Sequence, residues 1–102
     1  MFWYDVAMND EEKYIALAIE QAQIAKQKGS LPFGAVVVYE GNVVGIGYDT
    51  SKITNDVTAH AEINALRAAC ETLSAIDLSD CTIYCTNEPC NMCGCAIFQA
   101  EI

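Results

Sequence analysis

The residues with the clearest chemistry in this sequence stand at the starts of two predicted helices. One helix begins with His60-Ala61-Glu62 and the other with Pro89-Cys90-Asn91-Met92-Cys93. Zinc takes nitrogen and sulfur ligands in tetrahedral geometry, and a catalytic zinc site leaves one position for water. Cys90 and Cys93 are three residues apart and therefore share one face of a helix. Together with His60 they predict a zinc site with three protein ligands and one open position.

The charge of such a site predicts a role for Glu62. Two thiolates and a neutral imidazole already cancel the charge of Zn²⁺, so this site activates water less strongly than three histidines would. A base beside the water is therefore needed, and Glu62 is the candidate catalytic residue. Both helices direct their N-termini at the metal, where the positive partial charge of the helix favours anionic ligands.

Two structural interpretations compete with the catalytic one. A lone histidine usually has a structural role, but the only histidine of this chain precedes a glutamate by two residues at a helix start. The two ligand cysteines can instead form a Cys₄ site with Cys85 and Cys95, which leaves the histidine and the glutamate unexplained. We favour the catalytic site and interpret the other cysteines as packing residues, namely Cys70, Cys81, Cys85 and Cys95.

Hydrophobic periodicity predicts the elements that position these residues. Helices are expected over 10–28, 58–75 and 90–101, and strands over 33–39, 43–48 and 81–86. Asp10 is expected to cap the first helix and Gly29 to end it. The inward faces are expected to carry Tyr14, Ile15, Ala18, Ala22 and Ala25, widened by Leu17, Ile19 and Ile24, in the first helix, and Ile63, Leu66, Ala69, Cys70 and Leu73 in the second.

The order of these elements predicts the fold class. The first two strands flank Glu40-Gly41-Asn42 and read as a β-hairpin, and the first strand is apolar nearly throughout, as a strand buried on both faces would be. A helical crossover then leads to the third strand, which favours a sheet with helices on its faces. The sequence therefore predicts one α/β domain over residues 1–102 with the order α-β-β-α-β-α.

Composition limits the partners. The chain has 14 acidic and 5 basic residues and a net charge of −9. Nucleic acids bind mainly through phosphate neutralisation by Lys and Arg, so a nucleic-acid partner is not expected and a small neutral substrate is favoured. Met1 to Met8 lacks the basic start of a signal peptide, and no apolar run reaches membrane-spanning length. Clustered cysteines without a signal peptide predict a cytoplasmic, metal-binding protein.

The pairing of H-x-E with P-C-x-x-C is the signature of zinc deaminases, in which activated water attacks the ring carbon that bears the amino group. The chain resembles the cytidine and deoxycytidylate deaminase superfamily and, within it, the guanine deaminase type of nucleobase deaminase. The resemblance rests on four stretches, which are PFGAVVV (32–38), NDVTAHAE (55–62), LSDCTIY (78–84) and EPCNMC (88–93). It extends from about residue 10 to the C-terminus.

This resemblance implies a three-layer α/β/α sandwich, usually dimeric, with one Zn²⁺ per chain. It implies hydrolytic deamination of a purine or pyrimidine base or nucleoside, with guanine as the leading substrate and Glu62 as the proton shuttle. The residues implied on the substrate side are Phe33, Asp49, Ala61 and Glu88. The alternatives are a tRNA adenosine or cytosine/cytidine deaminase, and an inactive zinc-binding fragment that associates with itself or a partner.

Four departures from the family pattern bear on the substrate. Asp49 stands where the family usually has a substrate-contacting Asn, and an ionised carboxylate only accepts hydrogen bonds. Val57 replaces a frequent Pro. Gln99 stands at an aromatic pocket position of guanine deaminases and is closer to the pattern of tRNA adenosine deaminases. The sequence ends at Ile102, where the family continues with further strands and helices, so a C-terminally truncated domain with its third strand at an exposed sheet edge is expected.

Overall fold

The computed structural model describes residues 9–102, so the segment in which no signal peptide is predicted lies outside the described residues. The elements are α1 (Asp10–Gln27), β1 (Gly34–Tyr39), β2 (Asn42–Tyr48), α2 (Ser51–Thr54), α3 (Ala61–Leu73), β3 (Cys81–Cys85) and α4 (Asn91–Gln99). The predicted order is confirmed, with the addition of α2. This helix has only four residues, too few for hydrophobic periodicity to reveal it.

The three strands form one sheet in the order β2-β1-β3. β1 pairs antiparallel with both neighbours, so that Gly34 lies opposite Tyr48 and Ala35 lies opposite Cys85. Because β1 begins where β2 and β3 end, the segments next to these strand ends meet at one end of the sheet. β3 pairs only with β1 among the described residues, so it lies at the sheet edge as predicted.

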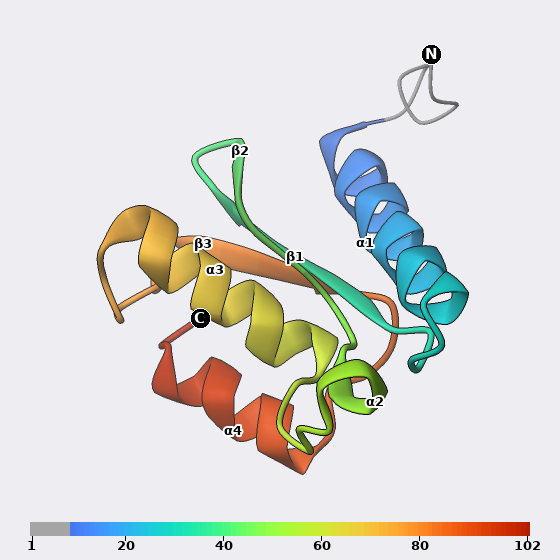
Figure 1. Ribbon diagram of the computed structural model, residues 1–102. Coiled ribbons are helices and arrows are strands. Elements are labelled where there is room, and N and C mark those ends of the chain that lie inside the picture. The colour runs from blue at the N-terminus through green and yellow to red at the C-terminus, as the bar shows by residue number, and fades with distance from the viewer. Residues whose placement is uncertain (1–8) are drawn as a thin grey trace.

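Helices cover both faces of the sheet and produce the three layers that the sequence predicts. α1 lies on one face, and α3 lies on the other with α4 beside it (Figure 1). The residues from Gly34 to Val38 are all buried, which confirms that β1 is a strand covered on both faces. None of the helices within residues 9–102 combines the length and the apolar character that crossing a bilayer requires.

Glycines on the strands let the helices approach the sheet closely. A methyl group at Gly34 would collide with the backbone of α1 at Ala18. On the opposite face, methyl groups at Gly45 and Gly47 would collide with the backbone of α3. The glycines of β2 are therefore required where α3 rests on the sheet, and this contact sets the position of the helix that begins after His60.

The close approach of α1 corrects two predictions. Ile15 and Ile19 are expected on the buried face but remain 39% and 42% exposed. The fully buried residues of α1 are all alanines, namely Ala16, Ala18, Ala22 and Ala25, because the helix lies close to the sheet, whereas the expected Tyr14, Leu17 and Ile24 are half-buried. Asp10 is not the N-cap, since Asn9 accepts the hydrogen bond from the backbone N–H of Glu12 at 2.9 Å.

The two helices next to the predicted ligands are shorter than expected: α3 covers Ala61–Leu73 instead of 58–75, and α4 covers Asn91–Gln99 instead of 90–101. α3 begins at Ala61 instead of Thr58, because the backbone N–H and the hydroxyl of Thr58 bond to the Asp56 carboxylate at 2.9 and 2.7 Å. It ends where Ser74 adopts a left-handed conformation with φ of 51°. Of the residues expected on its inner face, Leu66 and Ala69 are buried, whereas Ile63, Cys70 and Leu73 are only half-buried.

Candidate zinc centre

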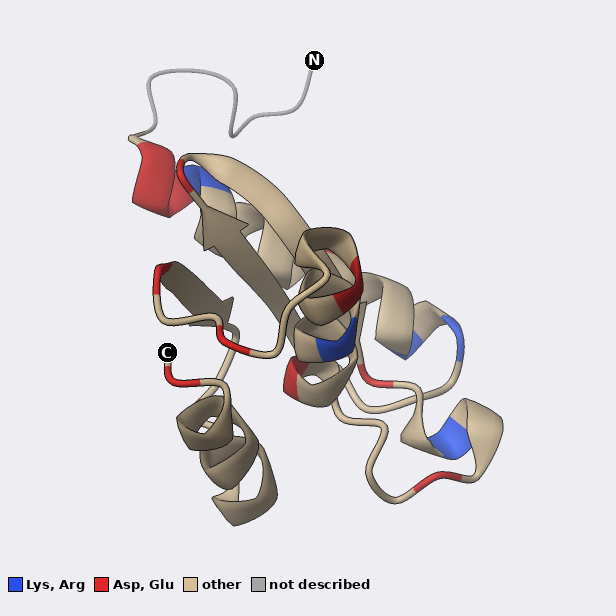
Figure 2. Ribbon diagram, turned by 90° about the vertical axis from the view of Figure 1, so that its left-hand side faces the viewer, with Lys and Arg blue, Asp and Glu red and all other residues tan. Residues whose placement is uncertain are grey.

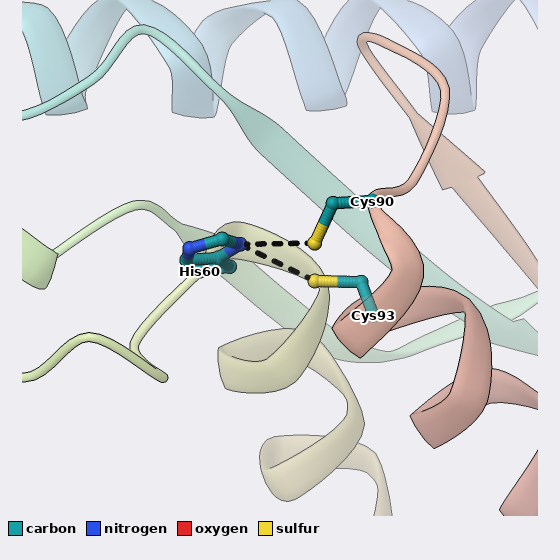
Figure 3. A group of neighbouring side chains, drawn as sticks. All are labelled: His60, Cys90 and Cys93. Carbon is teal, nitrogen blue, oxygen red and sulfur yellow. Dashed lines mark hydrogen bonds between the residues drawn. The ribbon is translucent and has the colours of Figure 1, made fainter.

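The three predicted ligands meet although 30 residues separate His60 from Cys90. The Nδ1 atom of His60 lies 3.6 Å from Sγ of Cys90 and 3.5 Å from Sγ of Cys93 (Figure 3). The three potential ligand atoms all lie within 4.8 Å of one another. Among the described residues, this is the group of three or more potential ligands that can hold a metal ion.

These distances fit a tetrahedral zinc ion. With Zn–N near 2.05 Å and Zn–S near 2.3 Å, the N···S edge of a tetrahedron is about 3.55 Å. The observed N···S separations of 3.5 and 3.6 Å match that edge without rearrangement. Ligation through Nδ1 also places the remaining ring proton on Nε2, which fixes the neutral tautomer of the histidine.

The backbone explains why these side chains are available for a metal. His60 is the N-cap of α3 and Cys90 is the N-cap of α4, both in extended conformation and without a side-chain capping bond. N-cap positions usually carry Ser, Thr, Asp or Asn, whose side chains satisfy the first helical N–H groups. Here His60 and Cys90 turn their side chains toward each other and leave the helix ends uncapped by side chains. Cys93 adds the third ligand from the first turn of α4.

The two thiols lie in different environments. The pKa of the exposed Cys90 thiol lies below its ordinary value, chiefly because the backbone N–H of Cys93 in the first turn of α4 favours the thiolate. Burial and, after it, the charge of Glu62 raise the pKa of the Cys93 thiol to about 12. Binding of a metal ion must therefore displace the proton from Cys93.

Glu62 lies in the first turn of α3 and is only 4% exposed. It follows the ligand His60 by two residues, and its charge contributes to the raised pKa values of the Cys93 and Cys85 thiols. Burial of a carboxylate beside a cation site is the arrangement that a proton-transferring residue needs. The shuttle role itself remains a prediction.

The four residues expected on the substrate side lie near the same end of the sheet but differ in accessibility. Phe33 precedes β1 and is half-buried, and Ala61 opens α3 and is fully buried. Glu88 precedes the N-cap of α4 and is exposed. Asp49 follows β2 and is fully buried, with its backbone N–H bonded to the carbonyl of Phe33 at 3.1 Å.

The Asp49 carboxylate uses its two oxygens unequally. Oδ1 accepts bonds from the Ser30 hydroxyl at 2.7 Å and from the hydroxyl and backbone N–H of Ser51 at 2.7 and 3.0 Å. Oδ2 is buried and has no hydrogen-bond partner among the described residues. Burial raises the pKa of Asp49, but the bonds from Ser30 and Ser51 outweigh it, and the pKa lies below its usual value. Asp49 is therefore an ionised acceptor with one free oxygen.

The segment before α3 lines a cavity beside His60, and its residues Ser51 and Lys52 are not predicted as site residues from the sequence. A cavity of about 530 Å³ is lined by Ser51, Lys52, Asn55, Asp56, Val57 and His60. His60 is the one ligand in this lining, and the four predicted substrate-side residues are not part of it. The polar composition of the segment, directly before the histidine, is the signal that could have identified it.

The remaining cysteines do not complete a Cys₄ site. Cys85 ends β3 and Cys95 lies exposed on α4, and the metal-competent group contains His60 instead of either. Burial raises the pKa of the Cys85 thiol to about 11. Cys81 is buried at the start of β3, as a packing residue should be, whereas Cys70 is half-buried.

Comparison with known proteins places this geometry in a family. Residues 8–102 match the family model described as the cytidine and deoxycytidylate deaminase zinc-binding region. The chain is 40% identical over 95 residues to the tRNA-specific adenosine deaminase of Agrobacterium fabrum, covering 93% of this chain and 62% of that protein. It is 48% identical over 70 residues to the guanine deaminase of Bacillus subtilis, covering 69% and 45%.

A solved structure from a study of A-to-I editing by tRNA:A34 deaminases at the wobble position of transfer RNA has the same fold. It superimposes with a TM-score of 0.89 at 39% identity, covering 92% of this chain and 72% of that one. The chain thus spans less than two thirds of the two curated relatives, at 62% and 45% of their lengths. Because relatives include tRNA deaminases, the prediction that nucleic acid is not a partner is not supported.

The family match and the His60, Cys90 and Cys93 cluster together show that this chain belongs to the cytidine and deoxycytidylate deaminase family and carries its zinc-binding region.

Proposed function

We propose that this protein is a zinc-dependent hydrolase that deaminates a nucleobase or nucleoside. The observation that carries the proposal is the cluster of His60, Cys90 and Cys93 with the buried carboxylate of Glu62 close by. Three ligands leave one coordination position of zinc open, which is typical of catalytic and not of structural zinc sites. Zn²⁺ held there supplies a Lewis acid that lowers the pKa of water.

Glu62 moves the protons in this proposal. Its carboxylate accepts a proton from the attacking water and donates it to the ring nitrogen next to the carbon under attack. It then takes the proton of the hydroxyl group added to the ring carbon and transfers it to the departing amino group, so that one water is consumed, a carbonyl replaces the amino group and ammonia leaves. The low exposure of Glu62 keeps this exchange away from bulk water.

Guanine is the substrate that we place first. The likeness to the guanine deaminase of Bacillus subtilis supports it, as does the net charge of −9. The basic residues of the chain are Lys13, Lys26, Lys28, Lys52 and Arg67. Figure 2 shows the Lys and Arg positions, in blue, dispersed over the ribbon without a continuous basic stripe. A neutral base needs no phosphate contacts, so it suits this surface better than a polyanion does.

We assign Phe33, Ala61 and Glu88 to the substrate side of the site and Asp49 to its floor. Oδ2 of Asp49 is buried in this structure, and substrate binding that uncovers it would let it accept, but not donate, a hydrogen bond. A base that presents an N–H at this position, as guanine can, is therefore favoured over one that presents an acceptor. Asp49→Asn should change the preference among bases while the zinc content stays at one ion per chain.

Ammonia release from guanine, guanosine, adenine, cytosine and cytidine tests the proposal directly. The zinc-loaded protein should release ammonia from guanine. Glu62→Gln should reduce turnover by about 10²–10⁴-fold, because an amide cannot transfer the proton. The zinc content of this variant, measured in the same samples, should remain at one per chain. Turnover of cytosine alone would exclude guanine, and equal turnover by Glu62→Gln would exclude the shuttle role.

A tRNA adenosine deaminase is the second candidate. The 40% identity to the Agrobacterium fabrum enzyme over nearly the whole chain favours it, as does Gln99 on the exposed side of α4. The test is binding and deamination of a tRNA anticodon stem-loop at low salt, where phosphate contacts are strongest. Failure to bind under these conditions excludes this candidate for the present chain.

We also propose that the chain forms a homodimer through α3 and α4. An apolar groove of about 590 Å³ lies on this face, lined by Ile63, Leu66, Arg67, Cys70, Ile76, Ala96, Gln99 and Ala100. Ile76 in this lining is 84% exposed, although burying such a side chain is favourable. Sedimentation should show a dimer that Ile76→Asp dissociates, while Ile53→Asp on α2 does not. A monomer that releases ammonia excludes both the dimer and the inactive self-associating fragment.

Two further predictions stand beside these proposals. The extent of the domain, taken as residues 1–102, and a cytoplasmic location both remain predictions from the sequence. Fractionation of cells that express the full coding frame would test the location.

A further inference from the structure

Asn64 lies in the first turn of α3 but directs its side chain to the segment before that helix. Its Nδ2 atom donates to the carbonyl of Tyr48 at 2.9 Å and to the hydroxyl of Thr50 at 3.1 Å. A longer contact of 3.5 Å reaches the carbonyl of Ala59. The first two acceptors lie where the chain leaves β2, and the third lies directly before His60. One amide group thus contacts both ends of the segment 49–59, which we name the His60 loop.

The backbone around Asn64 closes the same loop. The N–H of Thr50 donates to the carbonyl of Ala59 at 3.0 Å, so the two ends of the His60 loop are bonded to each other. The backbone N–H of Asn64 donates to the carbonyl of His60 at 3.0 Å. Asn64 therefore contacts the carbonyl group of the peptide unit that precedes His60 and the carbonyl group of the peptide unit that follows it.

His60 depends on this backbone because no side chain caps it. It is the N-cap of α3, in extended conformation with ψ of 159°, and its side chain makes no capping bond. The direction of the ring toward the two sulfurs therefore follows from the backbone at 59–60. A closed loop holds that backbone, whereas an open loop of this length would lose the restraint.

We propose that Asn64 is a positioning residue for the zinc ligand His60 and acts through the backbone of the His60 loop. The two N–H donors of this amide match the two nearest acceptors, the Tyr48 carbonyl and the Thr50 hydroxyl, and so bond the start of the His60 loop to the helix that follows its end. Asp has the same shape but presents only acceptor oxygens to Tyr48, Thr50 and Ala59. Leu has a similar size and makes no hydrogen bond. Gln keeps the amide but displaces it by one methylene.

Zinc affinity of Asn64→Asp, Asn64→Leu and Asn64→Gln tests the proposal in the full chain, by competition with a chromophoric chelator. We expect Asn64→Asp and Asn64→Leu to weaken zinc binding by about tenfold or more, in the range seen for loss of outer-shell partners of metal ligands. The absorption bands of the Co²⁺-loaded protein should shift, because the imidazole changes its direction. Asn64→Gln should recover part of both signals.

Two controls separate positioning from stability. Asn42→Asp makes the same amide-to-acid change in the hairpin turn, where the amide bonds to Glu40, and should bind zinc as the unchanged protein does. Ala69→Gly weakens α3 without touching the His60 loop. An equal loss of affinity in Ala69→Gly, or unchanged affinity and unchanged Co²⁺ bands in Asn64→Leu, would overturn the proposal. If Asn64→Asp does not fold, the Leu and Gln variants carry the test. Because metal binding is measured, the outcome is independent of whether the proposed deamination is correct.

Discussion

α3 and α4 both present an N-cap side chain to the zinc centre, yet they are held in different ways. α3 buries Ala61, Glu62, Ala65, Leu66 and Ala69 and rests on the glycines of β2. α4 buries only Cys93 among its nine residues and lies beside α3 at the outer side of that layer. The histidine and the glutamate thus come from a well-anchored helix, and the two thiolates come from a weakly anchored one.

This difference indicates what the metal does for the structure. A zinc ion that joins His60 to Cys90 and Cys93 links α4 to the helix that the sheet already holds. Metal binding then contributes to the folding of α4 more than to the folding of α3. The following experiments test whether α3 and α4 differ in how firmly they are anchored and in how much they depend on the metal.

The largest effect is expected from a change at the buried thiol of α4. Cys93→Ser should lower zinc affinity by more than about a hundredfold, beyond the effect of losing an outer-shell partner. Cys95→Ser makes the same change two residues further on the same helix, at an exposed thiol, and should retain one zinc per chain. Metal analysis after dialysis measures both. Loss of zinc from Cys95→Ser would restore the Cys₄ interpretation.

Removal of zinc should affect the two helices unequally. In the presence of a chelator, amide exchange in α4 should accelerate by about tenfold or more, because local opening costs less where few apolar groups are buried. Exchange in the middle of α3 should change little, since its contacts with β2 do not involve the metal. Equal acceleration in both helices would show that the anchoring of α3 also depends on zinc.

Two glycine substitutions compare the packing of the helices. Gly47→Ala forces a methyl group into the backbone of α3 and should lower the free energy of unfolding by about 1–3 kcal/mol, as overpacking does. Gly94→Ala on α4 meets no atom within 4 Å and should raise it by about 0.5–1 kcal/mol. Urea denaturation of the zinc-loaded variants measures both signs. Stabilisation by Gly47→Ala would contradict the close contact between β2 and α3.

The smallest effect concerns pH and the Asp49 carboxylate near α3. The pKa of Asp49 is lowered from 3.8 in the folded state, so its contribution to stability is fully present above pH 3.8 and is lost as the pH falls through the lower folded pKa. In metal-free protein, Asp49→Asn should therefore lose less stability than the unchanged protein between pH 4 and the acid limit of folding. Asp80→Asn, at an exposed position, serves as the control. Parallel pH profiles for the unchanged protein and Asp49→Asn would show that the Ser30 and Ser51 bonds do not favour the ionised form.

Local sequence patterns predicted most helices and strands of this fold, because hydrophobic periodicity and turn residues act within one segment of the chain. Helix periodicity located α1, α3 and α4, and the Glu40-Gly41-Asn42 turn located the hairpin. The errors lie where distant segments decide. Ile15 and Ile19 fit an amphipathic helix, but the sheet approaches α1 so closely that its fully buried residues are all alanines. Thr58 fits a helix start, but Asp56 takes its N–H and the helix begins later.

The sequence by itself predicted the zinc ligands and the proposed class of chemistry, because His60, Glu62, Cys90 and Cys93 have few other uses at that spacing. Only the tertiary structure decided that the His60 nitrogen lies at the N···S edge length of a zinc tetrahedron from both sulfurs, and that Asp49 keeps one buried oxygen without a partner among the described residues. It also decided that Asn64 holds the loop before the histidine. These properties depend on contacts between residues far apart in the chain, and the spacing of residue types along one segment does not encode the distance between two segments.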